Sequence, residues 1–138
     1  EVIDSRIEEV EHLLDMSAFM DNRIDKLSTG QKQRTSIARC LIHNPEVYIF
    51  DEPTLGLDII SSKAIIDFMK LEKTRGKSVL YSTHYMEEAE FLCDRIIMID
   101  KGKIIAVGTP QELKEETKTN NLRETFFAYM EGGKVDEQ

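Results

Sequence analysis

The sequence lacks the features that mark secreted, zinc-knuckle and membrane-spanning proteins. Its 138 residues include only two cysteines, Cys40 and Cys93, which form no C-x-x-C pair, so neither a disulfide framework nor a zinc knuckle is indicated. No apolar run approaches the roughly 18 to 20 residues of a membrane span. The N-terminus also lacks the basic start and the apolar stretch of a secretory signal. We therefore expect a protein that works in the cytoplasm.

Positive charge is scarce, and no block of Lys or Arg occurs anywhere. The chain has 18 Lys and Arg residues against 26 Asp and Glu, which gives a formal net charge of -8. Because such a chain has no electrostatic attraction to a polyanion, nucleic acid is not expected as a partner. Hydrophobic residues make up 41% of the sequence and are spread along its length, which supports a sizeable core. One globular domain, or a large piece of a bigger one, is expected.

Hydrophobic periodicity predicts alternating helices and strands. Helices are expected at 3–14, 28–43, 60–71, 85–92, from 110 onward and at 122–130. Strands are expected at 47–50, 78–82, 96–99 and 104–107, the last two joined by a tight turn as a β-hairpin. The run 47–50 is continuously apolar, which is typical of a strand buried on both faces of a parallel sheet. The predicted fold class is α/β, a mostly parallel sheet flanked by helices with a C-terminal β-hairpin.

Two acidic residues, Asp51 and Glu52, directly follow the first predicted strand. The carboxyl edge of a parallel sheet is where open α/β folds bind ligands. Magnesium prefers one or two carboxylates together with waters and phosphates, so Asp51 would hold the ion through water. Glu52 would then orient an attacking water. Taken alone, the pair is equally well explained as solvated loop residues after a strand.

The segment Leu27–Gln31 lies where a helix is predicted to begin. Ser28 is a good N-cap, and the unpaired amides and dipole of a helix start favour an anion such as phosphate. Taken alone, an ordinary helix cap is the better interpretation.

In combination, these segments resemble the second half of an ABC-transporter ATPase subunit. Four motifs occur in that family's order: Leu27–Gln31 resembles the signature motif, 47–53 the Walker B strand, Leu55–Asp58 the D-loop, and His84 the switch histidine. One such motif would be weak, but four in order span most of 27–110. Segment 82–90 and the tail around Phe126 resemble the export branch, which includes sodium-extruding and drug-exporting ATPases. The resemblance implies a partial P-loop NTPase-like domain.

The resemblance implies a role for each matching residue. Glu52 and His84 would be catalytic, with His84 near the γ-phosphate of ATP or the attacking water, and Asp51 would bind Mg²⁺. The residues that would bind ATP are Ser28, Thr29, Gly30, Gln31 and Asp58, the last as a contact across a dimer. The implied partners are a second ATPase subunit, head to tail, and membrane-spanning permease subunits. Such a subunit would be cytoplasmic and peripheral on the inner face of the cell membrane.

The sequence departs from the family pattern in two places. Thr29 stands where the family usually has Gly, and no G-x-x-x-x-G-K-[ST] loop is present. The triplet Gly76–Ser78 imitates the end of that loop, but it precedes a predicted strand and is interpreted as a helix-to-strand turn. The phosphate loop would then lie upstream of Glu1. We therefore expect a C-terminal fragment of a longer subunit, inactive by itself.

Three parts are expected along the chain: a helical-subdomain part at 1–45, a catalytic α/β part at 46–118, and a C-terminal helix and tail at 119–138. Two alternatives to a transport ATPase remain open from the sequence. One is an ABC-type ATPase that does not serve transport, and the other is an inactive half-domain that only dimerises or docks.

Overall fold

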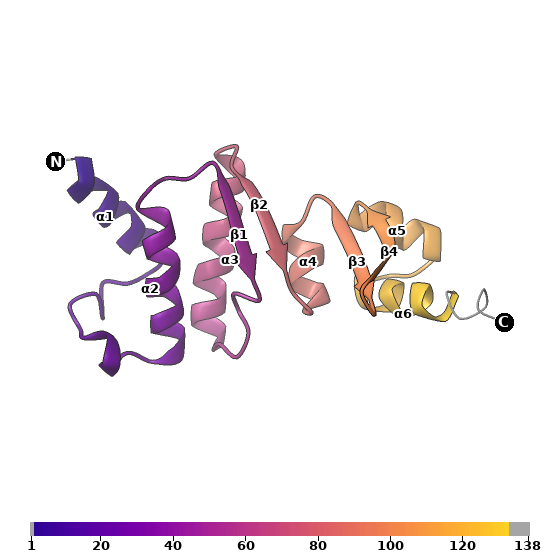
Figure 1. The fold of residues 1–138 in the computed structure, drawn as a ribbon, viewed down its shortest axis with the longest axis horizontal. Coiled ribbons are helices and arrows are strands. Elements are labelled where there is room, and N and C mark those ends of the chain that lie inside the picture. The colour runs from indigo at the N-terminus through magenta and orange to yellow at the C-terminus, as the bar shows by residue number, and fades with distance from the viewer. Residues whose placement is uncertain (1, 133–138) are drawn as a thin grey trace. The chain divides into compact units, whose positions relative to one another are not determined.

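A computed structural model describes residues 2–132, and their contacts divide the chain into two units between Ser82 and Thr83 (Figure 1). The first unit contains α1 (Val2–Leu13), a 3-10 turn (Ile24–Lys26), α2 (Thr29–Leu41), β1 (Val47–Asp51), α3 (Ile59–Thr74) and β2 (Ser78–Ser82). The second contains α4 (Met86–Leu92), β3 (Ile96–Asp100), β4 (Lys103–Gly108), α5 (Pro110–Thr117) and α6 (Leu122–Gly132). Every predicted helix and strand is therefore present, and the predicted α/β fold class is confirmed.

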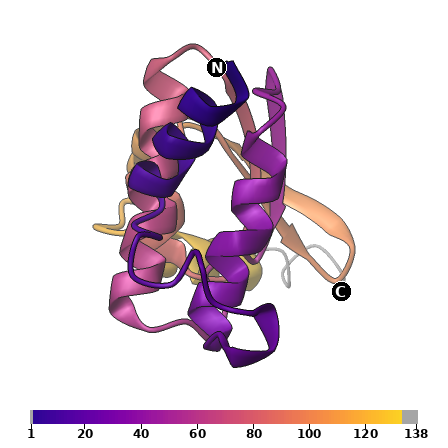
Figure 2. The same ribbon diagram turned by 90° about the vertical axis from the view of Figure 1, so that its left-hand side faces the viewer.

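The helices of the first unit begin and end at local signals. Ser28 caps α2, and Asp58 caps α3 by accepting a hydrogen bond from the Ser61 amide. Gly76 and Lys77 join Arg75, the C-cap of α3, to the first residue of β2, Ser78, so the segment 76–78 is the predicted helix-to-strand turn. Figures 1 and 2 show the N-terminal ends of α2 and α3 at the same end of this unit.

Strands β1 and β2 form a parallel pair in which Asp51 lies opposite Ser82. On one face, Tyr48 and Phe50 stack at 5.8 Å between ring centroids, and Phe68 of α3 meets both rings edge-on. Aromatic pairs of this geometry stabilise a fold by more than the burial of their apolar area alone. These contacts fix β1 on α3 and so fix the end of β1, where the acidic pair begins.

The expectation that β1 is buried on both faces is wrong for the described residues. Tyr48 is 3% exposed, but Val47 is 59% and Ile49 is 74% exposed. Successive side chains of a strand point to opposite faces, and α3 covers only the face of Tyr48 and Phe50. Leu80 of β2 is likewise exposed. Among residues 2–132, one face of the β1–β2 pair is therefore exposed, although β1 is apolar at every position from 47 to 50.

A buried polar network also holds the first unit together. The Tyr48 hydroxyl donates to Glu72 at 2.8 Å, and the fully buried Glu72 pairs with Arg75 at 3.0 Å. Arg75 in turn pairs with Glu9 of α1 at 2.7 Å. Burial raises the pKa of Tyr48, and its bond to Glu72 adds to the effect. The buried Tyr48 hydroxyl and Glu72 carboxylate thus both have hydrogen-bonding partners, as buried polar groups usually do. The network links α1, β1 and α3.

The second unit is built on the predicted β-hairpin. Strands β3 and β4 are antiparallel, and the turn between them places Lys101 and Gly102 at φ of 48° and 77°, as a two-residue hairpin turn requires. A capping box of Thr109 and Glu112 begins α5, with Pro110 in its first turn. The core of this unit centres on three buried side chains, those of Met98, Leu113 and Leu122.

The predicted division into three parts describes functional regions, whereas the two units are defined by contacts within the structure. The three-part division therefore stays a prediction. Its last part extends to residue 138, and residues 133–138 lie outside the described range. Within residues 2–132, no helix is both long enough and apolar enough to cross a membrane.

Candidate functional site

The start of α2 is a capping box with an exposed serine. The Gln31 amide donates to Ser28 Oγ at 3.2 Å, and the Ser28 amide donates to Gln31 Oε1 at 2.9 Å. Capping uses a lone pair of the hydroxyl, so its proton remains able to donate to a ligand. The Gln31 side chain therefore stabilises the start of α2.

The next two amides of α2 stand at the free end of the helix. The first intrahelical bond is donated by the Lys32 amide to Ser28 O, at 2.9 Å. The amides of Thr29 and Gly30 therefore precede the hydrogen-bond ladder, as the first amides of every helix do. Ser28 and Thr29 are exposed, while Gly30 is buried. Together with the helix dipole, this arrangement suits an anion.

The end of β1 is tied to the end of β2 by one side-chain and one backbone hydrogen bond. The exposed carboxylate of Asp51 accepts a hydrogen bond from the Ser82 hydroxyl through Oδ1, and the Glu52 amide donates to Ser82 O at 2.9 Å. The edge of the parallel pair thus continues one residue past β1. Glu52 is half-buried and follows Asp51 without a break.

Glu52 has an unusual backbone conformation. Its φ is 47°, in the left-handed region that non-glycine residues seldom adopt. The Leu55 amide donates to Glu52 O at 3.1 Å, which closes a turn over Pro53 and Thr54. Backbone strain of this kind concentrates at functional sites, where the surrounding structure must hold it. Asp15, Asn44, Lys101 and Lys118 share this conformation, so the strain of Glu52 fits a functional role without singling it out.

Asp58 serves as the N-cap of α3. Its carboxylate accepts from the Ser61 amide at 2.8 Å and from the Ser61 hydroxyl at 2.9 Å. These two bonds, the backbone bond first, lower the pKa of Asp58 below its ordinary value. The side chain is exposed, so it stays ionised and accessible at the end of the helix.

His84 is exposed and lies two residues after β2, at the beginning of the second unit. Its ring lies 4.3 Å from that of Tyr85, whose amide donates to Thr83 Oγ1 at 2.9 Å. Glu52 belongs to the first unit. The predicted meeting of His84 and Glu52 at one sheet edge therefore stays a prediction.

The oxygen donors at the end of β1 fit a magnesium ion that keeps most of its own ligands. Within the described range, no three His, Cys, Asp or Glu side chains gather as a metal cage. Mg²⁺ commonly takes one or two carboxylates and completes its shell with water and phosphate oxygens. The exposed Asp51 carboxylate suits that mode of binding.

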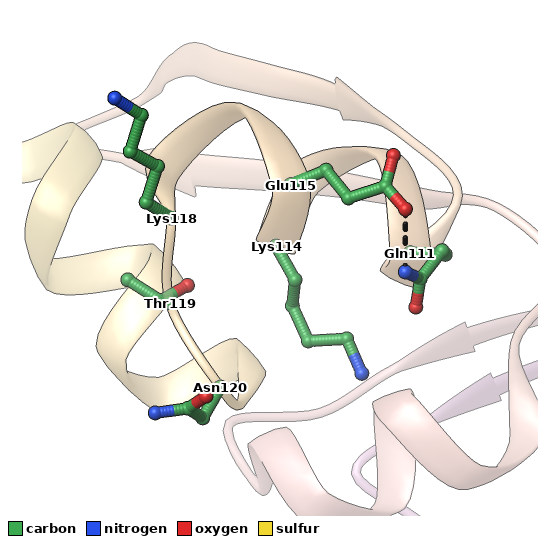
Figure 3. Close-up of a pocket in the computed structure, with 6 residues that line it drawn as sticks. All are labelled: Gln111, Lys114, Glu115, Lys118, Thr119 and Asn120. Atoms are coloured by element: carbon green, nitrogen blue, oxygen red, sulfur yellow. Dashed lines mark hydrogen bonds between the residues drawn. The ribbon is translucent and has the colours of Figure 1, made fainter.

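Two shallow depressions on the surface contain none of the predicted site residues. One of about 540 Å³ is lined by Arg23, Ile24, Asp25 and Lys32. The other, of about 350 Å³, lies beside α5 and the turn that follows it, where Gln111 donates to Glu115 at 2.6 Å (Figure 3). Neither depression is a site for the predicted chemistry.

Three residues that contact the candidate site or its helix were not predicted from the sequence. Ser82 binds Asp51, Ser61 binds Asp58, and Arg34 ties α2 to the loop after α1. Asp51 and Ser82 each stand at the end of a predicted strand, but the register that pairs them is seen only in the structure. The three-residue spacing from the N-cap Asp58 is a local signal for Ser61, whereas spacing along the chain carries no signal for Arg34.

Comparison with known proteins agrees with the motifs. The family described as "ABC transporter" matches residues 2–55. The ABC transporter ATP-binding protein NatA of Bacillus subtilis is 39% identical over 95% of this chain and 53% of its own length. The Nod factor export ATP-binding protein I of Rhizobium etli is 44% identical over 73% of this chain and 32% of its own.

A solved structure agrees in the same way. The dimeric post-hydrolysis state of an ATP-binding cassette bound to ADP and Pi matches with a TM-score of 0.67 and 32% identity. The match covers 76% of this chain and 46% of that one. The chain thus spans about half, or less, of the length of these proteins.

Proposed function

Because this chain belongs to the ABC transporter ATP-binding family, we propose that it supplies part of an ATP-hydrolysing site in a transport ATPase. The observation that carries the proposal is the end of β1, where Asp51 is hydrogen-bonded to Ser82 and Glu52 adopts a strained backbone conformation. The exposed start of α2 supplies a second, separate surface for phosphate.

The chemistry of phosphoryl transfer to water is mostly positioning and charge stabilisation. Glu52 acts as the general base that orients and deprotonates the attacking water. His84, as a neutral imidazole, hydrogen-bonds the γ-phosphate or that water. Asp51 would hold Mg²⁺, which would supply positive charge to the phosphates.

The start of α2 in this chain faces the phosphates of an ATP molecule that is bound mainly by another subunit. Ser28 donates its hydroxyl proton, and the amides of Thr29 and Gly30 point along the axis of the helix dipole. Gln31 keeps the helix start in place through the capping box. Thr29, in place of the usual glycine of the family, adds a second hydroxyl beside the phosphate path. Asp58 contacts the other subunit across the dimer.

The whole subunit is proposed to work in an export system. The name of the Rhizobium relative, an export ATP-binding protein, supports that direction. From the resemblance to the export branch, the substrate is proposed to be sodium ions or a drug-like molecule. The dimeric solved structure supports a pair of ATPase subunits, which we propose are arranged head to tail. Membrane-spanning permease subunits would hold the pair at the inner face of the membrane.

The proposal is tested in the complete subunit that contains this sequence. Glu52→Gln keeps the size and hydrogen bonding of the side chain but removes the base, so hydrolysis of Mg-ATP should collapse while ATP binding survives. Asp51→Asn, the matched neighbour, should weaken ATP binding and its Mg²⁺ dependence together. Unchanged turnover in Glu52→Gln would instead favour a half-domain that only dimerises or docks.

A further inference from the structure

The N-terminal ends of α2 and α3 touch at Gly30. A Cβ added to Gly30 would lie 2.2 Å from Ser61 Oγ, 2.8 Å from Ser61 Cβ and 3.0 Å from Asp58 Oδ2. Real Cβ atoms essentially never approach other heavy atoms more closely than 3.0 Å. Ser61 is only 1% exposed. The contact therefore has no room for any side chain larger than the hydrogen of glycine.

The atoms that face Gly30 are held in place by α3. Ser61 Oγ donates to Asp58 Oδ2 at 2.9 Å, while the Ser61 amide donates to Oδ1 of the same carboxylate at 2.8 Å. A rotation of the Ser61 side chain would break the first bond, and it would leave Ser61 Cβ where it is. A methyl group at Gly30 can therefore fit only if one helix end moves relative to the other.

The same two helix ends carry residues of the proposed site. Ser28 and Thr29 are exposed directly before Gly30, and the segment Leu55–Asp58 leads into α3. We infer that Gly30 and Ser61 are positioning residues, whose contact fixes the phosphate-binding end of α2 relative to the segment Leu55–Asp58. A displacement of either end is then passed to the other within one subunit. The inference rests on the proposed function, since the position of α2 affects turnover only if its end binds phosphate.

The first test is Gly30→Ala in the complete subunit. Alanine ordinarily stabilises a helix relative to glycine, so a loss here would report the contact. We expect a lower melting temperature and a kcat reduced by about tenfold or more, because small displacements of positioning groups are costly. Gly132→Ala is the matched control, because Gly132 is helical and a Cβ there meets nothing within 4 Å.

The second test is compensation at Ser61. Ser61→Gly removes both atoms that would clash, so combining it with Gly30→Ala should restore kcat and melting temperature to the level of Ser61→Gly alone. Ser61→Ala retains the Cβ at 2.8 Å and should restore less.

Each other outcome decides against part of the account. Normal kcat in Gly30→Ala, or recovery of melting temperature without recovery of kcat, would overturn the positioning role. The absence of ATP turnover in the unaltered subunit would contradict the proposed function itself. Thermal compensation between Gly30→Ala and Ser61→Gly would still test the contact in that case.

Discussion

Arg34 is a cationic side chain buried within the first unit, 7% exposed. Its Nη1 donates to Asp15 O at 2.8 Å and to Leu14 O at 3.2 Å, and its guanidinium lies 4.8 Å from the centre of the Phe19 ring. Both carbonyls are in the loop that follows α1. Arg34 therefore anchors α2, and with it the exposed Ser28, to that loop.

We predict that Arg34→Met lowers the free energy of unfolding by about 2 to 4 kcal/mol, because two carbonyls lose a charged donor. Arg39→Met on the exposed face of α2 is the matched control and should change stability by less than about 0.5 kcal/mol. Urea unfolding of both variants measures the difference. Equal stability of the two variants would show that the buried contacts of Arg34 contribute nothing.

At the scale of helices and strands, the accuracy of sequence-based prediction depends on how local each signal is. Ser28 and Pro110 predicted the starts of α2 and α5 because capping and first-turn preferences act within four residues. The exposure of Val47 and Ile49 was not predictable, since it depends on what covers the sheet. The partnership of Tyr48 with Glu72, 24 residues away, has no spacing rule either.

Two capping boxes of the same design allow a matched prediction. Ser28→Ala in α2 and Thr109→Ala in α5 each remove a side-chain acceptor from an N3 amide, and each should cost about 1 kcal/mol of stability. Only Ser28→Ala also removes the hydroxyl that we propose donates to phosphate. The two variants should therefore lose similar amounts of stability, as their melting temperatures will show. Only Ser28→Ala should also lose ATP turnover. Equal turnover in the two variants would reduce Ser28 to a helix cap.

At the scale of the whole molecule, four carboxyl groups among residues 2–132, distributed over both units, have lowered pKa values. The hydrogen-bond donors that lower them most are Arg6 for Glu9, the Ser61 amide for Asp58, Lys114 for Glu90, and the Thr109 amide for Glu112. Each group is therefore more acidic in the folded state than in the unfolded chain.

These shifts predict the direction of acid unfolding. A group with a lowered folded pKa stabilises the fold above its unfolded value, here 4.5 for Glu and 3.8 for Asp, and this stabilisation disappears as pH falls through the lower folded values. Melting temperature should be nearly constant from about pH 7 to about pH 5 and then fall steadily toward pH 3. A melting temperature that stayed constant or rose between pH 5 and pH 3 would contradict the assignment.

The candidate site was largely predictable from the sequence as a set of residues, and less so as an arrangement. Asp51, Glu52 and Ser28 lie where the strand end and the helix start predicted them, because both signals are local. His84 and Glu52 belong to different units, so their meeting at one sheet edge stays a prediction. The proposed site combines residues of this chain with residues of another subunit.

The most direct test of that claim mixes two inactive variants of the complete subunit. Glu52→Gln removes the base, and Ser28→Arg blocks the exposed start of α2 with a large side chain. If each site combines Glu52 of one subunit with Ser28 of the other, the mixed dimer holds one intact site and one site with both defects. An equal mixture should then recover up to about a quarter of the normal ATP turnover, since about half of the dimers are mixed. Turnover no higher than that of the separate variants would contradict a site shared between subunits.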